Sequence, residues 1–200
     1  MAPTAAPRRF VFATGNLGKR RELGRILAGC EVLSLGDFPG IVLPEEGDDY
    51  AANALAKADA VLAATGLASL GDDSGVEVDA LGGRPGVHSA RYGGPGLDDR
   101  GRCARLLAEL EPVAEPRRAR FVCVAACAMP DGRRFTTRGE CAGTIVRAAR
   151  GEAGFGYDPI FVPEGETATW AELPQDQKDR LSHRGLAFRA LMRRIEETDR

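Results

Sequence analysis

The residues best suited to chemistry in this sequence are two adjacent carboxylates, Asp72 and Asp73, in a Gly-Asp-Asp-Ser-Gly segment. Carboxylates that follow an apolar stretch are costly to bury unless they are paired, hydrogen-bonded or bound to a metal. Mg²⁺ prefers one or two carboxylates together with phosphate oxygens and water, so one acid could hold the ion while the other accepts a proton from an attacking water. The alternative is an ordinary polar turn.

A second segment, Thr14-Gly15-Asn16-Leu17-Gly18-Lys19, follows an expected strand and begins an expected helix. Backbone N–H groups at a helix start attract anions, and Lys19 adds a movable positive charge. The segment is not a Walker A loop, because the spacing is too short and no Ser or Thr follows the lysine. It favours phosphate binding, with an ordinary strand-to-helix turn as the alternative.

The segment Glu45-Glu46-Gly47-Asp48-Asp49 places carboxylates close together, where they repel one another unless something neutralises them. Asp48 and Asp49 suit the N-terminal turn of the following helix, where the helix dipole favours acids. Glu45 or Glu46 therefore remains available for a metal. The alternative is a solvated loop.

An aromatic segment, Gly154-Phe155-Gly156-Tyr157-Asp158-Pro159, combines glycines with two rings. Glycine lets the backbone approach a flat ligand closely, and an aromatic face can stack on a nucleobase. A turn that carries core aromatics is equally compatible with the residues.

Cations gather near the expected C-terminal helix, at Lys178 and in Ser182-His183-Arg184. Ser182 suits an N-cap, which places His183 and Arg184 in the first helical turn. Cations there oppose the helix dipole, so the pattern suggests a nearby anion or electron-rich base edge. A surface or core histidine is the alternative for His183.

Composition narrows the class of protein. Apolar residues make up 44% of the 200 residues, charged residues 28%, and the net charge of −2 gives no attraction to nucleic acid or membrane. The five cysteines are odd in number and form no C-x-x-C pair, which indicates reduced thiols rather than a disulfide framework or a zinc site. No stretch has the ~20 apolar residues of a spanning helix, and residues 1–7, an expected flexible tail, lack a signal-peptide core. We therefore expect a soluble, cytoplasmic protein.

The elements that would position these segments alternate between strands and helices. Expected strands span 8–13, 31–35, 68–70, 76–78, 120–129 and 133–146, the last two joined by a turn at Asp131-Gly132. One expected helix ends near residue 28, a second spans 50–64 and a third runs from 97 or 98 to 110. The last 30 residues are also expected to be helical. Residues 82–96 are expected to be a loop. The order predicts a three-layer α/β fold with a mixed central sheet.

These five segments, in this order, resemble the inosine triphosphatase family, also called dITP/XTP pyrophosphatases, from about Phe10 to Leu191. The resemblance implies one domain over residues 1–200, with an elongated fold whose twisted sheet carries two lobes flanking a cleft. It also implies a homodimer that binds Mg²⁺ and a small nucleotide. The reaction would convert ITP, dITP or XTP to the monophosphate and pyrophosphate, with a Mg²⁺-bound water attacking the α-phosphorus.

The resemblance also assigns roles to residues. Glu45 and Asp73 would bind the metal, and Asp73 would act as the catalytic proton acceptor. Lys57 would support the phosphate end. The substrate would be contacted by Thr14, Gly15, Asn16, Leu17, Gly18, Lys19, Ser74, Phe155, Gly156, Tyr157, Asp158, Lys178, His183 and Arg184.

Three residues depart from the family pattern. Ala52 stands where many relatives have Glu, and Glu46 stands where they often have Thr, so either Glu45 or Glu46 could hold the metal. His88 replaces a more usual aromatic and is read as a loop residue.

Two other functions are alternatives. The first is a Maf-type nucleotide pyrophosphatase, and the Ser-His-Arg and Phe-Gly-Tyr-Asp-Pro segments argue against it. The second is a non-catalytic nucleotide-binding module, and the Asp72–Asp73 pair argues against that.

Overall fold

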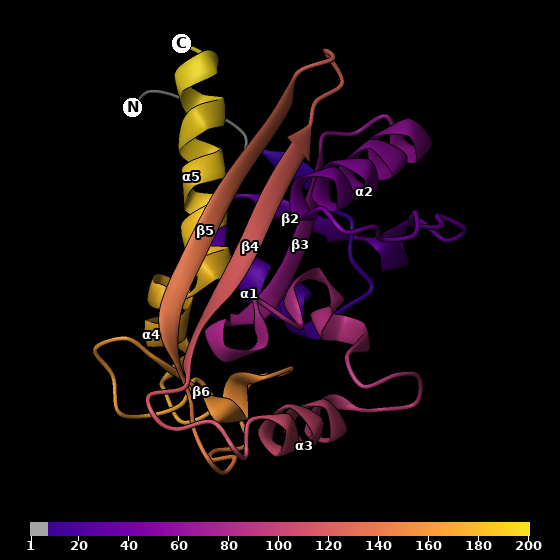
Figure 1. Ribbon diagram of the computed structural model, residues 1–200. Helices are drawn as coiled ribbons and strands as arrows, with labels where there is room; N and C mark the ends of the chain where they lie inside the picture. Colours follow the sequence, from indigo (N-terminus) through magenta and orange to yellow (C-terminus); the bar gives the residue numbers. More distant parts are fainter. Residues whose placement is uncertain (1–7) are drawn as a thin grey trace. The chain divides into compact units, whose positions relative to one another are not determined.

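The computed structural model describes residues 8–200 (Figure 1), so the tail expected at residues 1–7 lies outside the described residues. The strands are β1 (Arg9–Phe12), β2 (Glu31–Ser34), β3 (Ser69–Val78), β4 (Arg118–Ala128), β5 (Arg134–Ile145) and β6 (Phe161–Pro163). The α-helices are α1 (Leu17–Ile26), α2 (Tyr50–Thr65), α3 (Asp99–Glu109), α4 (Gln175–Leu181) and α5 (His183–Thr198).

The strands form one mixed sheet in the order β2-β1-β3-β4-β5-β6. Strand β1 runs parallel to both β2 and β3, whereas β6 runs antiparallel to β5. Parallel neighbours need a crossover connection, and α1 and α2 supply it. The α/β class and the mixed sheet predicted from the element order are thereby confirmed.

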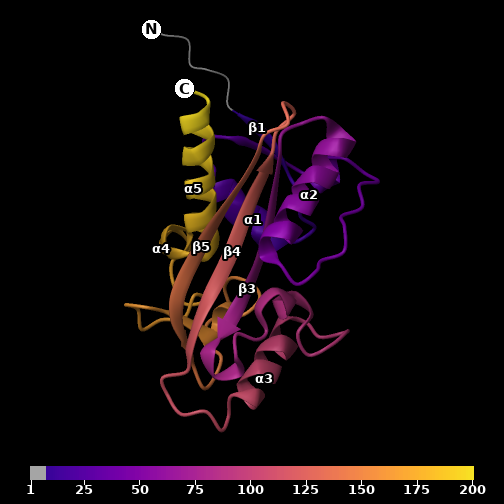
Figure 2. The ribbon, with the colours of Figure 1, turned by 45° about the horizontal axis from the view of Figure 1, so that its top comes forward.

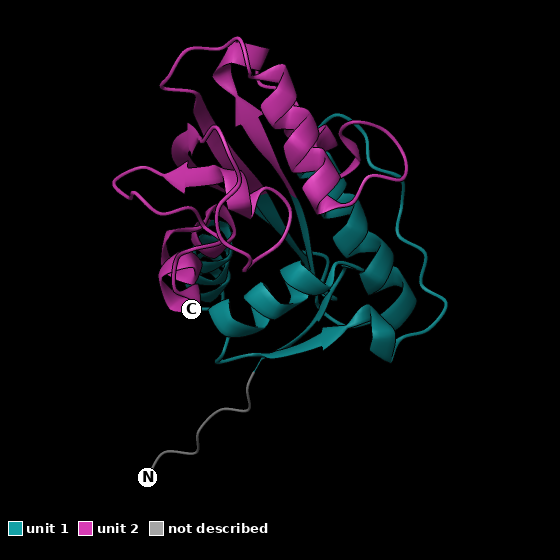
Figure 3. Cartoon of the chain, turned by 90° about the horizontal axis from the view of Figure 1, so that it is seen from below, with its two compact units in different colours: residues 1–73, 124–137, 187–200 teal, residues 74–123, 138–186 magenta. Residues whose placement is uncertain are grey.

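The chain divides into two compact units (Figure 3). Unit 1 contains the described part of residues 1–73 together with 124–137 and 187–200, and unit 2 contains residues 74–123 and 138–186. Each unit is built from separate stretches of sequence, because β3, β4 and β5 each contribute to both. The boundary in β3 falls between Asp73 and Ser74. The assignment of one domain to the whole chain stays a prediction.

Within unit 1, helices cover both faces of the strands. Successive side chains of a strand point to opposite faces. In β1, Val11 and the following Ala13 pack with Val61 of α2, whereas Phe12 packs edge-on against Phe188 of α5 with ring centroids 5.8 Å apart. Helices α2 and α5 therefore lie on opposite faces, as Figures 1 and 2 show, which gives this unit the predicted three layers.

Unit 2 has its own core around the ring of Phe121. The Phe121 centroid lies 4.8 Å from that of Phe161 and 4.7 Å from that of Trp170, and Cys103 and Leu106 of α3 belong to the same buried cluster. This core holds α3 against the strands and the loop that precedes β6.

All five cysteines are free thiols, which confirms that no disulfide framework exists. Burial raises the pKa of Cys103, Cys127 and Cys141 to about 12.

Among residues 8–200, none of the helices has both the length and the apolar character needed to cross a membrane.

The expectation of two short strands on either side of a turn at Gly-Asp-Asp-Ser-Gly is wrong, because β3 runs without a break from Ser69 to Val78. Two glycines allow this course. A Cβ on Gly71 would lie 2.1 Å from the backbone oxygen of Ala54 in α2, and a Cβ on Gly75 would lie 1.9 Å from the oxygen of Gly86. The glycines therefore mark close packing of the strand rather than a turn. The sequence also did not reveal the short strand β6.

The C-terminal helical region consists of two helices rather than one, with Ser182 in extended conformation between them. The Ser182 hydroxyl accepts a hydrogen bond of 3.0 Å from the backbone N–H of Gly185, so the predicted N-cap is confirmed. His183 and Arg184 occupy the first turn of α5, also as predicted.

We predict that Gly71→Ala lowers the free energy of unfolding by about 2 kcal/mol, because the new methyl group would overlap the backbone of α2. Urea unfolding followed by circular dichroism measures this loss. Gly24→Ala is the matched control, since Gly24 lies in α1 with nothing near its Cβ position, and it should raise stability by roughly 0.5–1 kcal/mol. Equal stabilities for the two variants would contradict the close approach of β3 and α2.

Candidate active site

Unit 1 gathers charged side chains at the first half of β3. This carboxylate cluster consists of Lys19, Glu46, Asn53, Lys57, Asp72 and Asp73. Asp72 is 1% exposed and Asp73 is 3% exposed. Since ionised carboxylates are rarely buried so deeply without partners, the surrounding cations and donors must compensate them.

The buried ammonium of Lys57 connects the acids. Its Nζ donates to the Glu46 carboxylate, donates to the backbone oxygen of Asp72 over 3.1 Å, and lies 3.9 Å from Asp73 Oδ1. Burial by itself would lower the pKa of Lys57, but the carboxylates of Asp72, Glu46 and Asp73 outweigh this effect and raise it. Lys57 therefore stays charged and acts as an internal counter-ion.

Asn53 joins the acidic loop to β3. Its amide group donates to Asp73 Oδ2 over 2.7 Å, and it exchanges two hydrogen bonds, of 2.8 and 3.0 Å, with the backbone of Gly47. Asp49 caps α2 by accepting a bond of 2.7 Å from the N–H of Ala52, in agreement with its expected role as a helix acid. The loop is thus held beside Asp73.

The start of α1 lies next to the same acids. Lys19 Nζ lies 3.1 Å from Asp72 Oδ1. The side chain of Asn16 caps the helix by accepting a bond from the N–H of Lys19, and the hydroxyl of Thr14 accepts one from the N–H of Asn16. The structure therefore brings the predicted phosphate-binding segment together with the Asp72–Asp73 pair.

Burial is the main cause of a raised pKa at Asp73, and it outweighs the opposing effects of the Asn53 hydrogen bond and the Lys57 charge. A carboxylate with a raised pKa accepts a proton more readily than an ordinary aspartate does. The site thus contains a buried carboxyl group with a raised pKa beside two lysines.

The carboxylate oxygens of this cluster suit a metal ion that takes only one or two ligands from the protein and the rest from phosphate and water. Over residues 8–200, His, Cys, Asp and Glu side chains nowhere form a group of three that could hold a metal ion. Mg²⁺ needs only one or two carboxylates when phosphate oxygens complete its shell. Glu46 and Asp73 both lie against the Lys57 ammonium, whereas Glu45 is exposed.

Asn53 and Lys57 contact the acids of this cluster, and motif reading largely missed them, because Lys57 entered only through the resemblance. Both lie on α2, four residues apart, on the face that also carries the buried Ala54 and Ala58. The sequence signal that could have revealed them was a pair of polar residues, four positions apart, on the otherwise apolar face of a predicted helix.

Unit 2 contains the other predicted residues, in an arrangement of rings and cations around Phe155. This aromatic cluster consists of Phe121, Phe155, Asp158, Trp170, Lys178, His183 and Arg184. Lys178 Nζ lies 5.0 Å and Arg184 Cζ 5.7 Å from the Phe155 ring centroid, within cation–π range. The Arg184 guanidinium also donates to the hydroxyl of Ser74 over 2.9 Å.

Asp158 holds the loop of Phe155 in place. Its Oδ2 accepts a hydrogen bond from the buried ammonium of Lys178 and another, of 2.8 Å, from the N–H of Phe155. Asp158 therefore acts on the loop backbone and on a cation, rather than presenting a surface carboxylate.

The two rings of the aromatic segment have different environments. Phe155 is half-buried, whereas Tyr157 is buried and its hydroxyl donates to the backbone oxygen of Ser89 over 2.8 Å. Burial also raises the pKa of Tyr157. Of the two, Phe155 is therefore the ring whose face suits a nucleobase.

His183 is buried among rings. Its imidazole is stacked on Phe121, with centroids 4.8 Å apart, and on Trp170, with centroids 5.3 Å apart. Trp170, which sequence reasoning missed, also lies 5.5 Å from Lys178 Nζ. No motif indicated it, because a single tryptophan is typical of any core.

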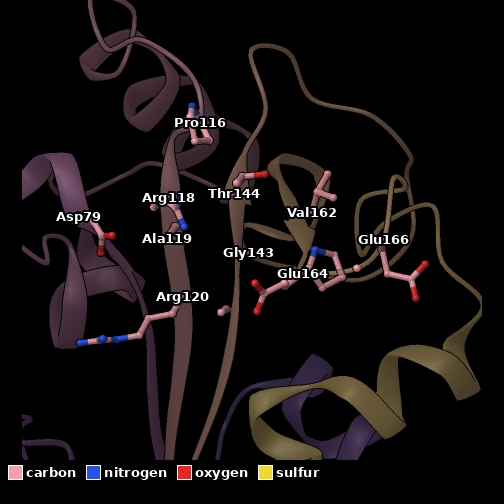
Figure 4. Close-up of a pocket in the computed structure, with 13 residues that line it drawn as sticks. Asp79, Pro116, Arg118, Ala119, Arg120, Gly143, Thr144, Val162, Glu164 and Glu166 are labelled. Carbon is pink, nitrogen blue, oxygen red and sulfur yellow. The ribbon is translucent and has the colours of Figure 1, made fainter.

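Two pockets in unit 2 differ in their relation to these residues. A pocket of about 410 Å³, lined by Arg118, Thr144 and Glu164 among others, contains none of the predicted site residues (Figure 4). A second pocket, of about 470 Å³, is lined by α3 and by residues 151–156, including Phe155. The second pocket adjoins the aromatic segment and the first does not.

The chain is similar to known proteins over nearly its whole length. The model of the Ham1 family matches residues 10–194. A dITP/XTP pyrophosphatase of Desulforamulus reducens is 47% identical over 188 residues, covering 92% of this chain and 94% of that protein. One of Thermus thermophilus is 50% identical over 187 residues, covering 92% and 90%. The solved structure of the Staphylococcus aureus Ham1 protein gives a TM-score of 0.83 at 35% identity, covering 96% of this chain and 100% of that one.

These matches extend over nearly the whole chain and confirm the predicted resemblance to dITP/XTP pyrophosphatases. The structural match agrees with the mixed α/β fold. The chain belongs to the Ham1 family.

Proposed function

We propose that this chain hydrolyses non-standard purine nucleoside triphosphates, ITP, dITP and XTP, to the nucleoside monophosphate and pyrophosphate. The observation that carries the proposal is the buried Asp72–Asp73 pair, compensated by Lys19 in the first turn of α1 and by Lys57 of α2. The relatives named dITP/XTP pyrophosphatase support the choice of substrate.

The phosphate chain would bind at the carboxylate cluster. Lys19 and the backbone amides at the start of α1 provide positive charge, and Lys57 supports the same region. These groups would hold the β- and γ-phosphates and stabilise charge on the leaving pyrophosphate.

Mg²⁺ would be held by Asp73 together with Glu46 or Glu45. When bound, it would neutralise charge on the phosphates and polarise the bonds to phosphorus. Contact of Glu46 and Asp73 with one ammonium supports Glu46 as the second ligand, in place of the Glu45 expected from the family pattern.

Asp73 would orient a water and accept its proton as the water attacks the α-phosphorus. The burial that raises the pKa of Asp73 supports this role, and Asn53 fixes the carboxylate by a hydrogen bond. Pyrophosphate then leaves from the side held by Lys19.

The base would bind in the aromatic cluster, with its face on Phe155. Lys178 and Arg184 carry only hydrogen-bond donors and lie beside that ring. They would pair with the C6 oxygen of hypoxanthine or xanthine and would oppose the C6 amino group of adenine, donor to donor. Guanine has the same C6 oxygen, so this argument separates ITP from ATP and not from GTP.

The homodimer and the cytoplasmic location are also proposed, and both rest on the family resemblance. A non-catalytic nucleotide-binding module remains the rival of another class. Binding alone does not require a second buried acid beside the metal ligand, which favours the enzyme.

The function is tested by measuring pyrophosphate release from ITP, XTP, GTP and ATP, each with and without Mg²⁺. We expect kcat/KM for ITP and XTP to exceed that for ATP by about 10²-fold or more, because buried donors reject a mismatched partner strongly. Activity without Mg²⁺ should be close to zero. Binding of ITP without any release would favour the non-catalytic module.

Asp73→Asn should lower kcat for ITP by about 10²–10⁴-fold, the usual effect of losing a positioned base. The control is Glu77→Gln on the same strand, where Glu77 pairs with Arg120, and it should keep near-normal kcat. Near-normal turnover in Asp73→Asn would remove Asp73 from the mechanism.

Glu46→Gln and Glu45→Gln separate the two candidate metal ligands. We expect Glu46→Gln to raise the Mg²⁺ concentration for half-maximal activity by about tenfold or more, and Glu45→Gln to leave it nearly unchanged. A Mg²⁺ titration at saturating ITP measures both. The reverse result would restore Glu45 as the ligand.

A further inference from the structure

The loop that carries Phe155 is held by hydrogen bonds from helix α3 as well as by Asp158. The N–H of Gly156 donates to Asp99 Oδ2 over 2.7 Å, and the thiol of Cys103 lies 3.3 Å from the Gly156 carbonyl oxygen, to which it donates. Asp99 and Cys103 both lie on α3, so both backbone groups of one residue are attached to the same helix.

Asp99 is not the residue that caps α3. Asp98 is the N-cap and accepts a bond of 2.8 Å from the N–H of Gly101. Asp99 instead directs its two oxygens differently, with Oδ2 on Gly156 and Oδ1 at 3.2 Å from the Arg102 guanidinium. The contact of Asp99 with the loop is therefore separable from helix capping.

The loop conformation depends on such bonds. Gly156 has φ +61° and Gly154 has φ +82°, a left-handed backbone that few residues adopt. A Cβ on Gly154 would lie 2.0 Å from Asp158 Oδ2, so the loop is wrapped tightly around that carboxylate. The backbone N–H groups of its two central residues, Phe155 and Gly156, donate to different carboxylates, those of Asp158 and Asp99.

We propose that Asp99 is a positioning residue for base selection: its bond to Gly156 fixes the Phe155 ring in front of Lys178 and Arg184. The inference rests on the proposed function, in which Phe155 stacks on the base. If the Phe155 ring could shift, it would still offer an apolar face, but it would no longer hold a base at a fixed position relative to the donors of Lys178 and Arg184. Discrimination between bases would therefore fall, whereas the phosphate chemistry in unit 1 would continue.

The test compares Asp99→Ala, Asp99→Asn and Asp98→Ala in the full chain. Asp99→Ala should raise KM for ITP by about tenfold, the usual effect of losing a charge-assisted hydrogen bond, and reduce the ITP-to-ATP ratio of kcat/KM, with kcat within about twofold of wild type. Asp99→Asn keeps an oxygen acceptor, so KM for ITP and the ITP-to-ATP ratio of kcat/KM should both stay close to the wild-type values. Asp98→Ala should lower Tm through the lost cap while KM and the ratio stay unchanged.

A second measurement does not depend on turnover. The chain has a single tryptophan, Trp170, 5.5 Å from Lys178 Nζ, so its fluorescence can report the Kd for IMP. Asp99→Ala should weaken IMP binding by about tenfold, and Asp99→Asn much less.

The outcomes separate the two proposals. The positioning role is overturned if Asp99→Ala changes KM, the base ratio and the IMP Kd no more than Asp98→Ala does, or if it lowers kcat alone. Wild-type protein that binds IMP without releasing pyrophosphate from ITP overturns the proposed catalysis, and the IMP titration still decides the role of Asp99. Wild-type protein that binds no purine nucleotide overturns both.

Discussion

The charge of Lys57 is the constraint on which the rest of the carboxylate cluster depends. A buried ammonium is costly unless its surroundings compensate it, and here Glu46, Asp73 and the backbone of Asp72 do so. The relation is mutual, because the acids, 1% and 3% exposed, need a cation as much as Lys57 needs anions. Helix α2 must therefore lie directly against β3, with its polar positions turned toward the acids.

Glycine makes that contact geometrically feasible. Any side chain at Gly71 would meet the backbone of α2, and any at Gly75 would meet the carbonyl of Gly86. The Asp-Asp-Ser stretch is thus flanked by two positions of very close packing, and β3 continues without a break through these three polar residues. Such close packing would suit the positioned base proposed for Asp73, since proton transfer depends on short and well-aligned contacts.

The aromatic cluster uses the same principle with a different carboxylate. Asp158 joins a buried lysine to the backbone of the loop that carries Phe155, while α3 holds the other side of that loop through Gly156. Rings contribute packing area and cations contribute donors, so the arrangement suits a ligand that is flat and rich in acceptors.

The sequence alone determined the α/β class, the place of Asp49 at the start of a helix and the N-cap at Ser182, because these depend on local spacing and local hydrogen bonds. Tertiary structure decided the unbroken course of β3, the inward turn of Tyr157 and the contacts of Asn53 and Lys57 with the acids. Those features join residues far apart in the chain, such as Lys19 and Asp72, separated by 53 positions, or Tyr157 and Ser89, separated by 68. Such partners are chosen by the packing of whole elements against one another, and no local pattern encodes them.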